Sequence, residues 1–165
     1  MAQSFALTSS DFKNGDTLPK KHVHQAMGAG GDNLSPSLAW SGAPAGTKSF
    51  AITAYDPDAP TGSGWWHWVV YDIPADTTAL AQGAGNAAGA SLPAGTKQGR
   101  TDFGTKEYGG AAPPPGDKPH RYIFKVYALN TDKLDVPADA SAAYVGFMIH
   151  FAKLAEAELV ATYGR

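Results

Sequence analysis

The sequence predicts a single globular domain that is mainly β. Its 165 residues are enough for one domain and too few for two of ordinary size. The 19 glycines and 12 prolines disfavour a largely helical chain, because both residue types disrupt helix interiors. A hydrophobic content of 43% and an aromatic content of 11% exclude a disordered chain. We therefore expect residues 1–165 to form one turn-rich domain.

The first predicted strand follows an irregular N-terminal third. Turn-forming residues are frequent up to residue 40, where 35–40 predicts a short extended piece. The segment 49–55 then predicts a strand, because alternate apolar residues share one face, and two closely spaced prolines end it. That apolar face consists of Phe50, Ile52 and Ala54.

The segment 65–73 predicts a second strand that is covered on both sides. Strict alternation divides it into two faces: His67 with Val69, Tyr71 and Ile73, and Trp66 with Trp68 and Val70. Apolar residues on both faces are typical of a strand inside a β-sandwich. The Gly- and Ala-rich segment 82–94 that follows predicts a long surface loop.

A third strand and one helix complete the predicted elements. Residues 121–129 alternate as a strand, with Tyr122, Phe124, Val126 and Ala128 on one side.

The helix follows Pro137, with Asp139 as its N-cap. Its large apolar residues recur at three- and four-residue spacing, and we interpret this stripe as a face packed on the core. The stripe consists of Tyr144, Phe147, Met148, Phe151, Leu154 and Ala155. The segment 158–163 fits either a continued helix or a last strand.

Charge and targeting patterns restrict the partners. A formal net charge of −2 and a longest basic cluster of only Lys20-Lys21-His22 disfavour nucleic acid. The absence of cysteine excludes disulfides and thiolate chemistry. No apolar run has the ~20 residues of a membrane span, and the first residues lack the pattern of a secretion signal. The cytoplasm is the expected location, although an exported protein that had lost its leader would have the same sequence. We expect a solvated loop at His22 and His24.

Polar residues at strand ends form a candidate binding site. Asp56 ends the first strand before Pro57, His67 lies within the second strand, and His120 shares a strand face with Tyr122. The backbone N–H groups of Gly109 and Gly110 can approach a ligand closely, because glycine has no side chain. Amides, a phenol and imidazolium groups suit an oxyanion such as phosphate, while Asp56 would fix the tautomer or charge of a histidine.

The same residues carry a resemblance to a known family. Asp56-Pro57-Asp58-Ala59-Pro60, Trp66-His67-Trp68, and Gly110 with Pro113-Pro114 and His120-Arg121-Tyr122 resemble signature blocks of the phosphatidylethanolamine-binding protein family. The segments 33–40, 102–104 and 157–165 are similar to its bacterial branch, the Raf kinase inhibitor-like proteins. A departure lies at Ala111-Ala112, where many relatives carry Pro and Cys or a glycine.

This resemblance implies an antiparallel β-sandwich with an anion pocket. It implies pocket roles for Asp56, His67, Gly110, His120 and Tyr122, with Trp65 and Pro113 as walls. It also implies binding of phosphate-bearing groups (phospholipid heads, nucleotides and phosphorylated side chains), control of kinases or proteases as in some relatives, and a cis proline near residue 60. It implies binding without catalysis and no cofactor.

Two alternatives to this anion-binding function stay open at this stage. His67, His120 and Asp56 match the ligand count of a metal-dependent enzyme with two histidines and one carboxylate. The pocket could also be a vestige on a protein that acts through its surface alone. The sequence permits a homodimer without predicting one, and it names neither the physiological ligand nor a protein partner.

Overall fold

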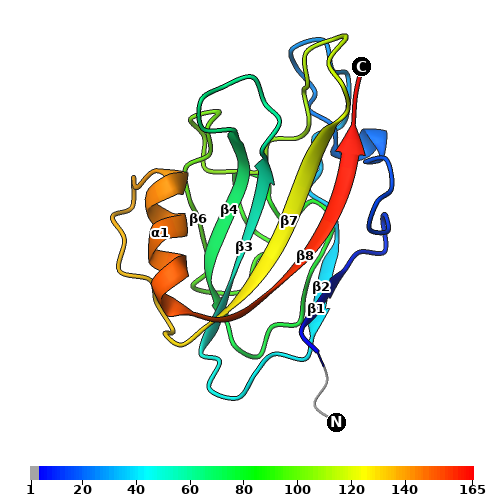
Figure 1. Ribbon diagram of the computed structural model, residues 1–165. Helices are drawn as coiled ribbons and strands as arrows, with labels where there is room; N and C mark the ends of the chain where they lie inside the picture. Colours follow the sequence, from blue (N-terminus) through cyan, green and yellow to red (C-terminus); the bar gives the residue numbers. More distant parts are fainter. Residues whose placement is uncertain (1–3) are drawn as a thin grey trace.

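Two antiparallel β-sheets and one α-helix make up the fold (Figure 1). The computed structural model describes residues 4–165. The elements in chain order are β1 (Ala6–Thr8), the short 3₁₀ turn η1 (Lys20–His22), β2 (Leu38–Ser41), β3 (Ser49–Asp56), β4 (Trp65–Pro74), β5 (Ala79–Leu80), β6 (Lys97–Gln98), β7 (His120–Leu129), α1 (Ala142–Ala152) and β8 (Lys153–Tyr163). The predicted strands at 49–55, 65–73 and 121–129 are confirmed, and the segment after the helix is a strand.

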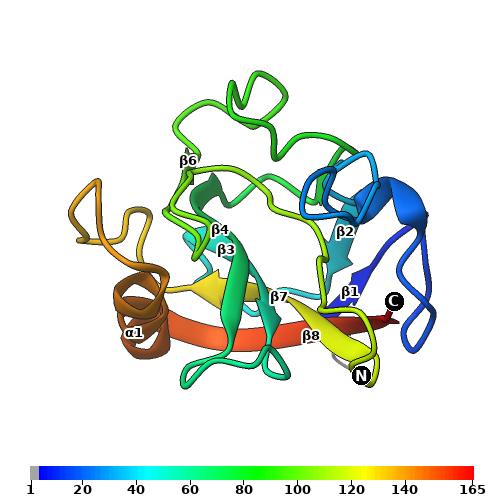
Figure 2. The ribbon, with the colours of Figure 1, turned by 90° about the horizontal axis from the view of Figure 1, so that it is seen from above.

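The larger sheet has the order β6-β4-β3-β7-β8 and the smaller one β1-β2-β5. Neighbouring strands within both sheets are antiparallel, as the predicted fold class requires. Figure 2 shows the smaller sheet and the long loops on one side of the larger sheet, and α1 toward another side. The segment 82–94 is a loop between β5 and β6, as predicted, but it does not lie wholly on the surface, because Ala84 and Gly85 are buried. Within residues 4–165 no helix combines the length and apolarity needed to cross a bilayer.

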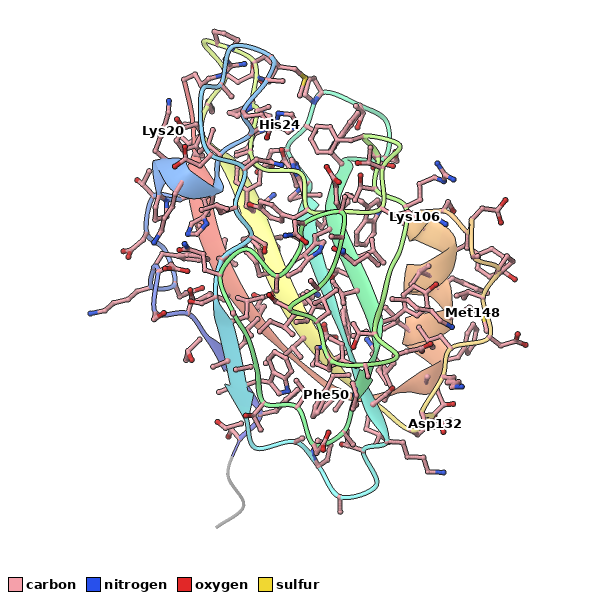
Figure 3. All side chains as sticks on the ribbon, turned by 180° about the vertical axis from the view of Figure 1, so that it is seen from behind. Lys20, His24, Phe50, Lys106, Asp132 and Met148 are labelled. Carbon is pink, nitrogen blue, oxygen red and sulfur yellow. The ribbon has the colours of Figure 1, made fainter. Side chains whose placement is uncertain are left out.

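Two hydrophobic cores lie on the two faces of the larger sheet. The first is shared with the smaller sheet and includes Phe50, Ile52 and Phe124, together with Trp40 of β2. The second lies beneath α1 and includes Ala51, Val69 and Leu129. In Figure 3, Phe50 lies toward one end of the molecule and His24 toward the other, where the candidate site is found.

The predicted faces of β4 are partly wrong, because two β-bulges interrupt its alternation. Ala54 pairs with Trp68 and Tyr55 with Trp66, which leaves His67 as the extra residue of the first bulge. Trp66 consequently packs against the core beneath α1, while His67 turns toward the site.

A second bulge lies between Val70 and Ile73, where Asp72 adopts a positive φ of 58°. It returns Ile73 to the first core, which it shares with Trp68 and Val70. Val69 and Tyr71 remain in the core beneath α1.

The start and end of the helix differ from the prediction. Ser141, not Asp139, is the N-cap, and its Oγ accepts a hydrogen bond of 3.1 Å from the N–H of Tyr144. The helix ends at Ala152, so Leu154 and Ala155 belong to β8.

The aromatic stripe of the helix is also not a core face. Ala142, Val145, Ile149 and Ala152 face the sheet instead. Tyr144, Phe147 and Phe151 are 48%, 62% and 67% exposed, and only Met148 of the predicted helical stripe packs on the core. The helix is apolar on opposite sides, and the side with smaller and aliphatic residues is the one that approaches the sheet.

Candidate functional site

A pocket opens where β3 ends and β4 and β7 begin. Its volume is about 190 Å³, smaller than the ~300–1,000 Å³ of sites for drug-sized ligands. Six of the seven predicted site residues line it: Asp56, Trp65, His67, Pro113, His120 and Tyr122. The other lining residues are Met27, Ala59, Pro60, Thr61, Phe103, Ala112 and Pro114.

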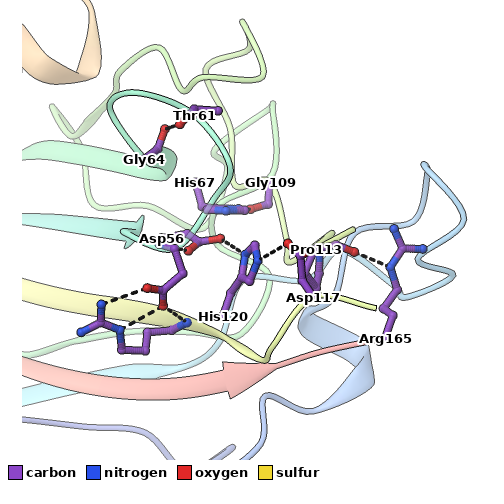
Figure 4. Close-up of polar contacts among 11 residues, drawn as sticks. Asp56, Thr61, Gly64, His67, Gly109, Pro113, Asp117, His120 and Arg165 are labelled. Carbon is purple, nitrogen blue, oxygen red and sulfur yellow. Dashed lines mark hydrogen bonds and ion pairs between the residues drawn. The ribbon is translucent and has the colours of Figure 1, made fainter. Parts of the chain in front are cut away.

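The pair formed by Asp56 and His120 is the polar centre of this pocket (Figure 4). Asp56 is the last residue of β3 and His120 the first of β7, and the pairing of these strands brings the two together. His120 Nδ1 donates to Asp56 Oδ2 over 2.7 Å, and both side chains are almost completely buried. The second oxygen, Oδ1, accepts from the backbone N–H of Asp58, which fixes the carboxylate at the turn. The sequence correctly predicted that Asp56 would orient a histidine.

A second carboxylate, which the sequence reasoning missed, holds the other nitrogen of His120. Asp117 precedes it by three residues, and its Oδ2 lies 2.9 Å from Nε2 (Figure 4). Burial disfavours the charged imidazole, but the hydrogen bonds to Asp117 and Asp56 outweigh burial and raise the pKa of His120. His120 is therefore held as an imidazolium between two acids.

His67 has the opposite character. Its side chain is buried, and Nδ1 donates a hydrogen bond of 2.8 Å to the carbonyl of Gly109. Burial lowers the pKa of His67 to about 4, despite the stabilising effect of that carbonyl. The ring is thus neutral at neutral pH, and Nε2 carries a lone pair. The expectation of two imidazolium donors is wrong, because His67 can only accept through Nε2.

Gly109 and Gly110 do not offer free amides. The N–H of Gly109 donates to the carbonyl of His67 over 2.9 Å, and that of Gly110 donates to Asn33 Oδ1 over 2.7 Å. Gly110 does not line the pocket, which corrects its predicted role as an anion donor. A Cβ at Gly110 would overlap the backbone of His22 and His24, so glycine is needed here for close packing of two chain segments. Asn33 was missed because nothing in its turn sequence reveals this bond.

The unpartnered donors of the pocket are Tyr122 and Trp65. Tyr122 is 2% exposed, and neither its Oη nor the Nε1 of Trp65 has a hydrogen-bond partner among the described residues. Burial raises the pKa of Tyr122, so its hydroxyl stays protonated and can donate. A buried donor without a partner is unfavourable, and a ligand acceptor would relieve this.

Aromatic and proline residues form the walls. Phe103 contacts the rings of Trp65 and His67 edge-on, with centroids 5.3 Å and 5.4 Å apart. Arg165 Nε donates to the carbonyl of Pro113 over 2.7 Å and ties the C-terminus to this wall (Figure 4). No peptide bond in residues 4–165 is cis, so the predicted cis proline is wrong for this chain.

Comparison with known proteins identifies the family of this chain. A sequence model described as phosphatidylethanolamine-binding protein matches residues 8–164. The chain belongs to the phosphatidylethanolamine-binding protein family.

Bacterial members of this family are similar over nearly the whole chain. The UPF0098 protein YbcL of Escherichia coli is 54% identical over 98% of this chain and 88% of its own length. YbhB of the same organism is 57% identical over 95% of this chain and 98% of its own. The crystal structure of YbcL, described as a new member of the mammalian family, superposes with a TM-score of 0.95 and covers 98% of both chains.

The metal-site alternative finds no support in the geometry of this family member. No group of three or more His, Cys, Asp or Glu side chains within residues 4–165 is arranged to hold a metal ion. His120 already uses both ring nitrogens for Asp56 and Asp117, so it has no lone pair to offer.

His22 is not part of a solvated loop. It is completely buried, and its Nδ1 bonds the carbonyl of Leu34 over 2.8 Å. Its expected exposure beside His24 is therefore wrong.

Proposed function

We propose that the protein binds the phosphate group of small phosphorylated ligands in this pocket, and that it acts by binding rather than by catalysis. The observation that carries the proposal is a buried hydroxyl, that of Tyr122, which has no hydrogen-bond partner within residues 4–165 and lines the same pocket as the imidazolium of His120. A protonated phenol and a cation are donors suited to an oxyanion. The candidate ligands are phospholipid head groups, nucleotides and phosphorylated side chains.

The charge of the pocket limits how an anion enters. His120 is balanced by Asp56 and already bonded to Asp117, whose side chain is 38% exposed. A bound anion must therefore replace Asp117 as the acceptor of the hydrogen bond from Nε2 of His120. The Asp117 side chain can then move into solvent. In this scheme Asp117 occupies the place of the ligand oxyanion in the unliganded protein.

The other lining residues of the pocket favour a ligand that has both a hydrogen-bond donor and an apolar part. His67 Nε2 accepts, so it suits the hydroxyl of a phosphate monoanion or an ammonium group on the ligand. Trp65, Phe103 and Pro113 provide apolar walls around the polar floor. We also propose that the protein modulates a kinase or protease that carries such a phosphate. We propose the cytoplasm as the place where it acts.

The direct test is calorimetric titration with sulfate and with phosphoethanolamine at pH 6 and pH 8. Sulfate remains a dianion across this range, so any change in its affinity reports on the protein. Because a bound dianion favours the imidazolium, its affinity should fall as His120 loses its proton.

Tyr122→Phe is the matched variant, since it removes only a hydroxyl that none of the described residues bonds. It should keep the stability of the wild type and weaken binding about 5- to 10-fold, the effect of one lost hydrogen bond. Absence of binding by wild-type protein with both ligands at both pH values would disprove the proposal.

A further inference from the structure

A second pocket lies beside the phosphate site and shares two lining residues with it, Met27 and Phe103. Its volume is about 340 Å³, within the range of ~300–1,000 Å³ that is usual for ligand sites. His24, Thr105 and Glu107 line this second pocket, which we call the side pocket. A ligand that fills the phosphate site therefore has room to continue past Met27 and Phe103.

The ring of Phe103 forms the partition between the two pockets. Its centroid lies 5.4 Å from that of His67, which lines the phosphate site, and 4.9 Å from that of His24, which lines the side pocket. A Cβ at Gly109 would overlap this ring, so glycine is needed there for the partition to keep its place. The N–H of Phe103 donates to Thr101 Oγ1 over 3.2 Å and anchors the segment. The partition is thus built into the fold.

Most polar groups of the side pocket are already engaged within the protein. Asn33 Nδ2 donates to the carbonyl of Tyr108 over 3.1 Å, and Asn33 Oδ1 accepts from Gly110. His24 Nδ1 accepts from the N–H of Ala26 over 2.9 Å. Burial lowers the pKa of His24, although the charge of Glu107 opposes this effect. The His24 ring is therefore neutral at neutral pH and carries its hydrogen on Nε2.

Glu107 determines the charge of the side pocket. Among the described residues, it is the only lining residue that is charged at neutral pH, and its sequence neighbour Lys106 does not line the pocket. The phosphate site, by contrast, contains the imidazolium of His120. Adjacent subsites of opposite charge select a ligand whose own charges are separated in the matching order. The ligand should therefore carry a cation at a short distance from its phosphate.

We infer that the side pocket is a specificity subsite for a lysine or arginine side chain close to the phosphorylated residue of a bound peptide. This inference rests on the proposed function and selects phosphorylated peptides among its candidate ligands. An extended chain advances ~3.3–3.6 Å per residue, so a basic residue two positions away can place its charge beyond the ring of Phe103. The short linker of phosphoethanolamine keeps its ammonium group on the near side of that ring.

The test is calorimetric titration with two blocked pentapeptides that have phosphoserine at the centre. One carries lysine at both ends and the other glutamine, so both chain directions are covered. The wild type should bind the lysine peptide about three- to fivefold more tightly, the effect of one partly exposed ion pair. Glu107→Gln should abolish this preference and leave the affinity for sulfate unchanged. Asp132→Asn removes the same charge toward the opposite end of the molecule from His24 and should keep the preference (Figure 3).

A charge exchange separates recognition from a structural role of Glu107. Glu107→Lys should prefer a pentapeptide with glutamate at both ends over the glutamine peptide, which a loss of structure would not produce. Wild-type protein that binds sulfate but binds the lysine and glutamine peptides equally would overturn the subsite and leave the proposed function intact. Failure to bind sulfate, phosphoethanolamine or either peptide would overturn both. Equal weakening of phosphoethanolamine and lysine-peptide binding by Glu107→Gln would overturn the peptide assignment and indicate a small ammonium ligand.

Discussion

Asp117 Oδ2 lies 2.9 Å from Nε2 of His120, on the ring nitrogen that Asp56 leaves free. The imidazolium is therefore paired twice within the protein before any ligand arrives. Asp56 is buried and fixed, whereas the Asp117 side chain is 38% exposed and can leave. The two acids consequently have different roles: one holds the ring, and the other competes with an incoming anion.

Asp117→Asn should increase the affinity for sulfate at pH 6. The substitution removes the competing charge, while Asp56 still stabilises the imidazolium. Because Asp117 is partly exposed, we expect a modest gain of about threefold to tenfold, measured by calorimetry. Asp135→Asn changes an exposed acid outside the pocket and should leave the affinity unchanged. Weaker binding by Asp117→Asn would mean that Asp117 supports the cation more than it blocks the site.

His67 should make the protein less stable in acid. Its pKa is about 4 in the folded state and near 6.5 in the unfolded chain, so the unfolded state binds a proton first as the pH falls. The free energy of unfolding should thus decrease from pH 6.5 downward, by up to about 3 kcal/mol at pH 4 from this group.

Urea unfolding at several pH values measures this effect. His67→Gln lacks the titrating ring. The difference in free energy of unfolding between the wild type and this variant should therefore shrink by up to about 3 kcal/mol between pH 6.5 and pH 4. Parallel pH curves for the two proteins would contradict the assignment of a buried neutral His67. His120 has the opposite sign: its raised pKa gives stability that is complete below pH 6.5 and is lost as the pH rises through the folded-state pKa.

Gly110→Ala should destabilise the fold strongly. The added Cβ would overlap backbone atoms of His22, Val23 and His24, which cannot rotate away as a side chain can. We expect a loss of about 2–3 kcal/mol in the free energy of unfolding. Gly62→Ala is the control, because nothing lies within 4 Å of its Cβ position. A Gly110→Ala protein with wild-type stability but weaker anion binding would restore the amide-donor role of Gly110.

Ser141→Ala should cost about 1 kcal/mol of stability, because it removes the side-chain cap of α1. Asp139→Ala should have little effect, since Ser141 provides the cap. Thermal unfolding followed by circular dichroism compares the two. The reverse order of effects would show that the helix begins earlier than Ser141.

Alternation in the sequence predicted some strands better than others for a physical reason. β3 and β7 pair through an uninterrupted register, so every second residue of each falls on the same face. In β4 two bulges break this rule, and neither leaves a glycine or proline as a sign in the sequence. Alternation alone therefore placed Trp66 and His67 on the wrong sides.

The site was predictable where it depends on strand ends and unpredictable where it depends on turns. Asp56 and His120 meet because β3 and β7 are neighbours, which the resemblance already implied. Asp117 and Asn33 reach the site from irregular segments whose conformation follows from packing, not from local patterns. Likewise, periodicity identified the helix but could not choose between its two apolar sides.

Because of the bulge at His67, the number of residues in β4 matters as much as their identity for placing side chains on the correct face. Removal of one residue there would restore simple alternation, send the imidazole toward the helix and turn the indole of Trp66 into the pocket. Insertions and deletions should therefore be excluded from this short stretch but accepted at the exposed residues 86–88 of the loop between β5 and β6. In a library of shuffled or shortened variants, survivors should show a fixed residue count between Trp65 and Trp68 before they show any fixed loop sequence.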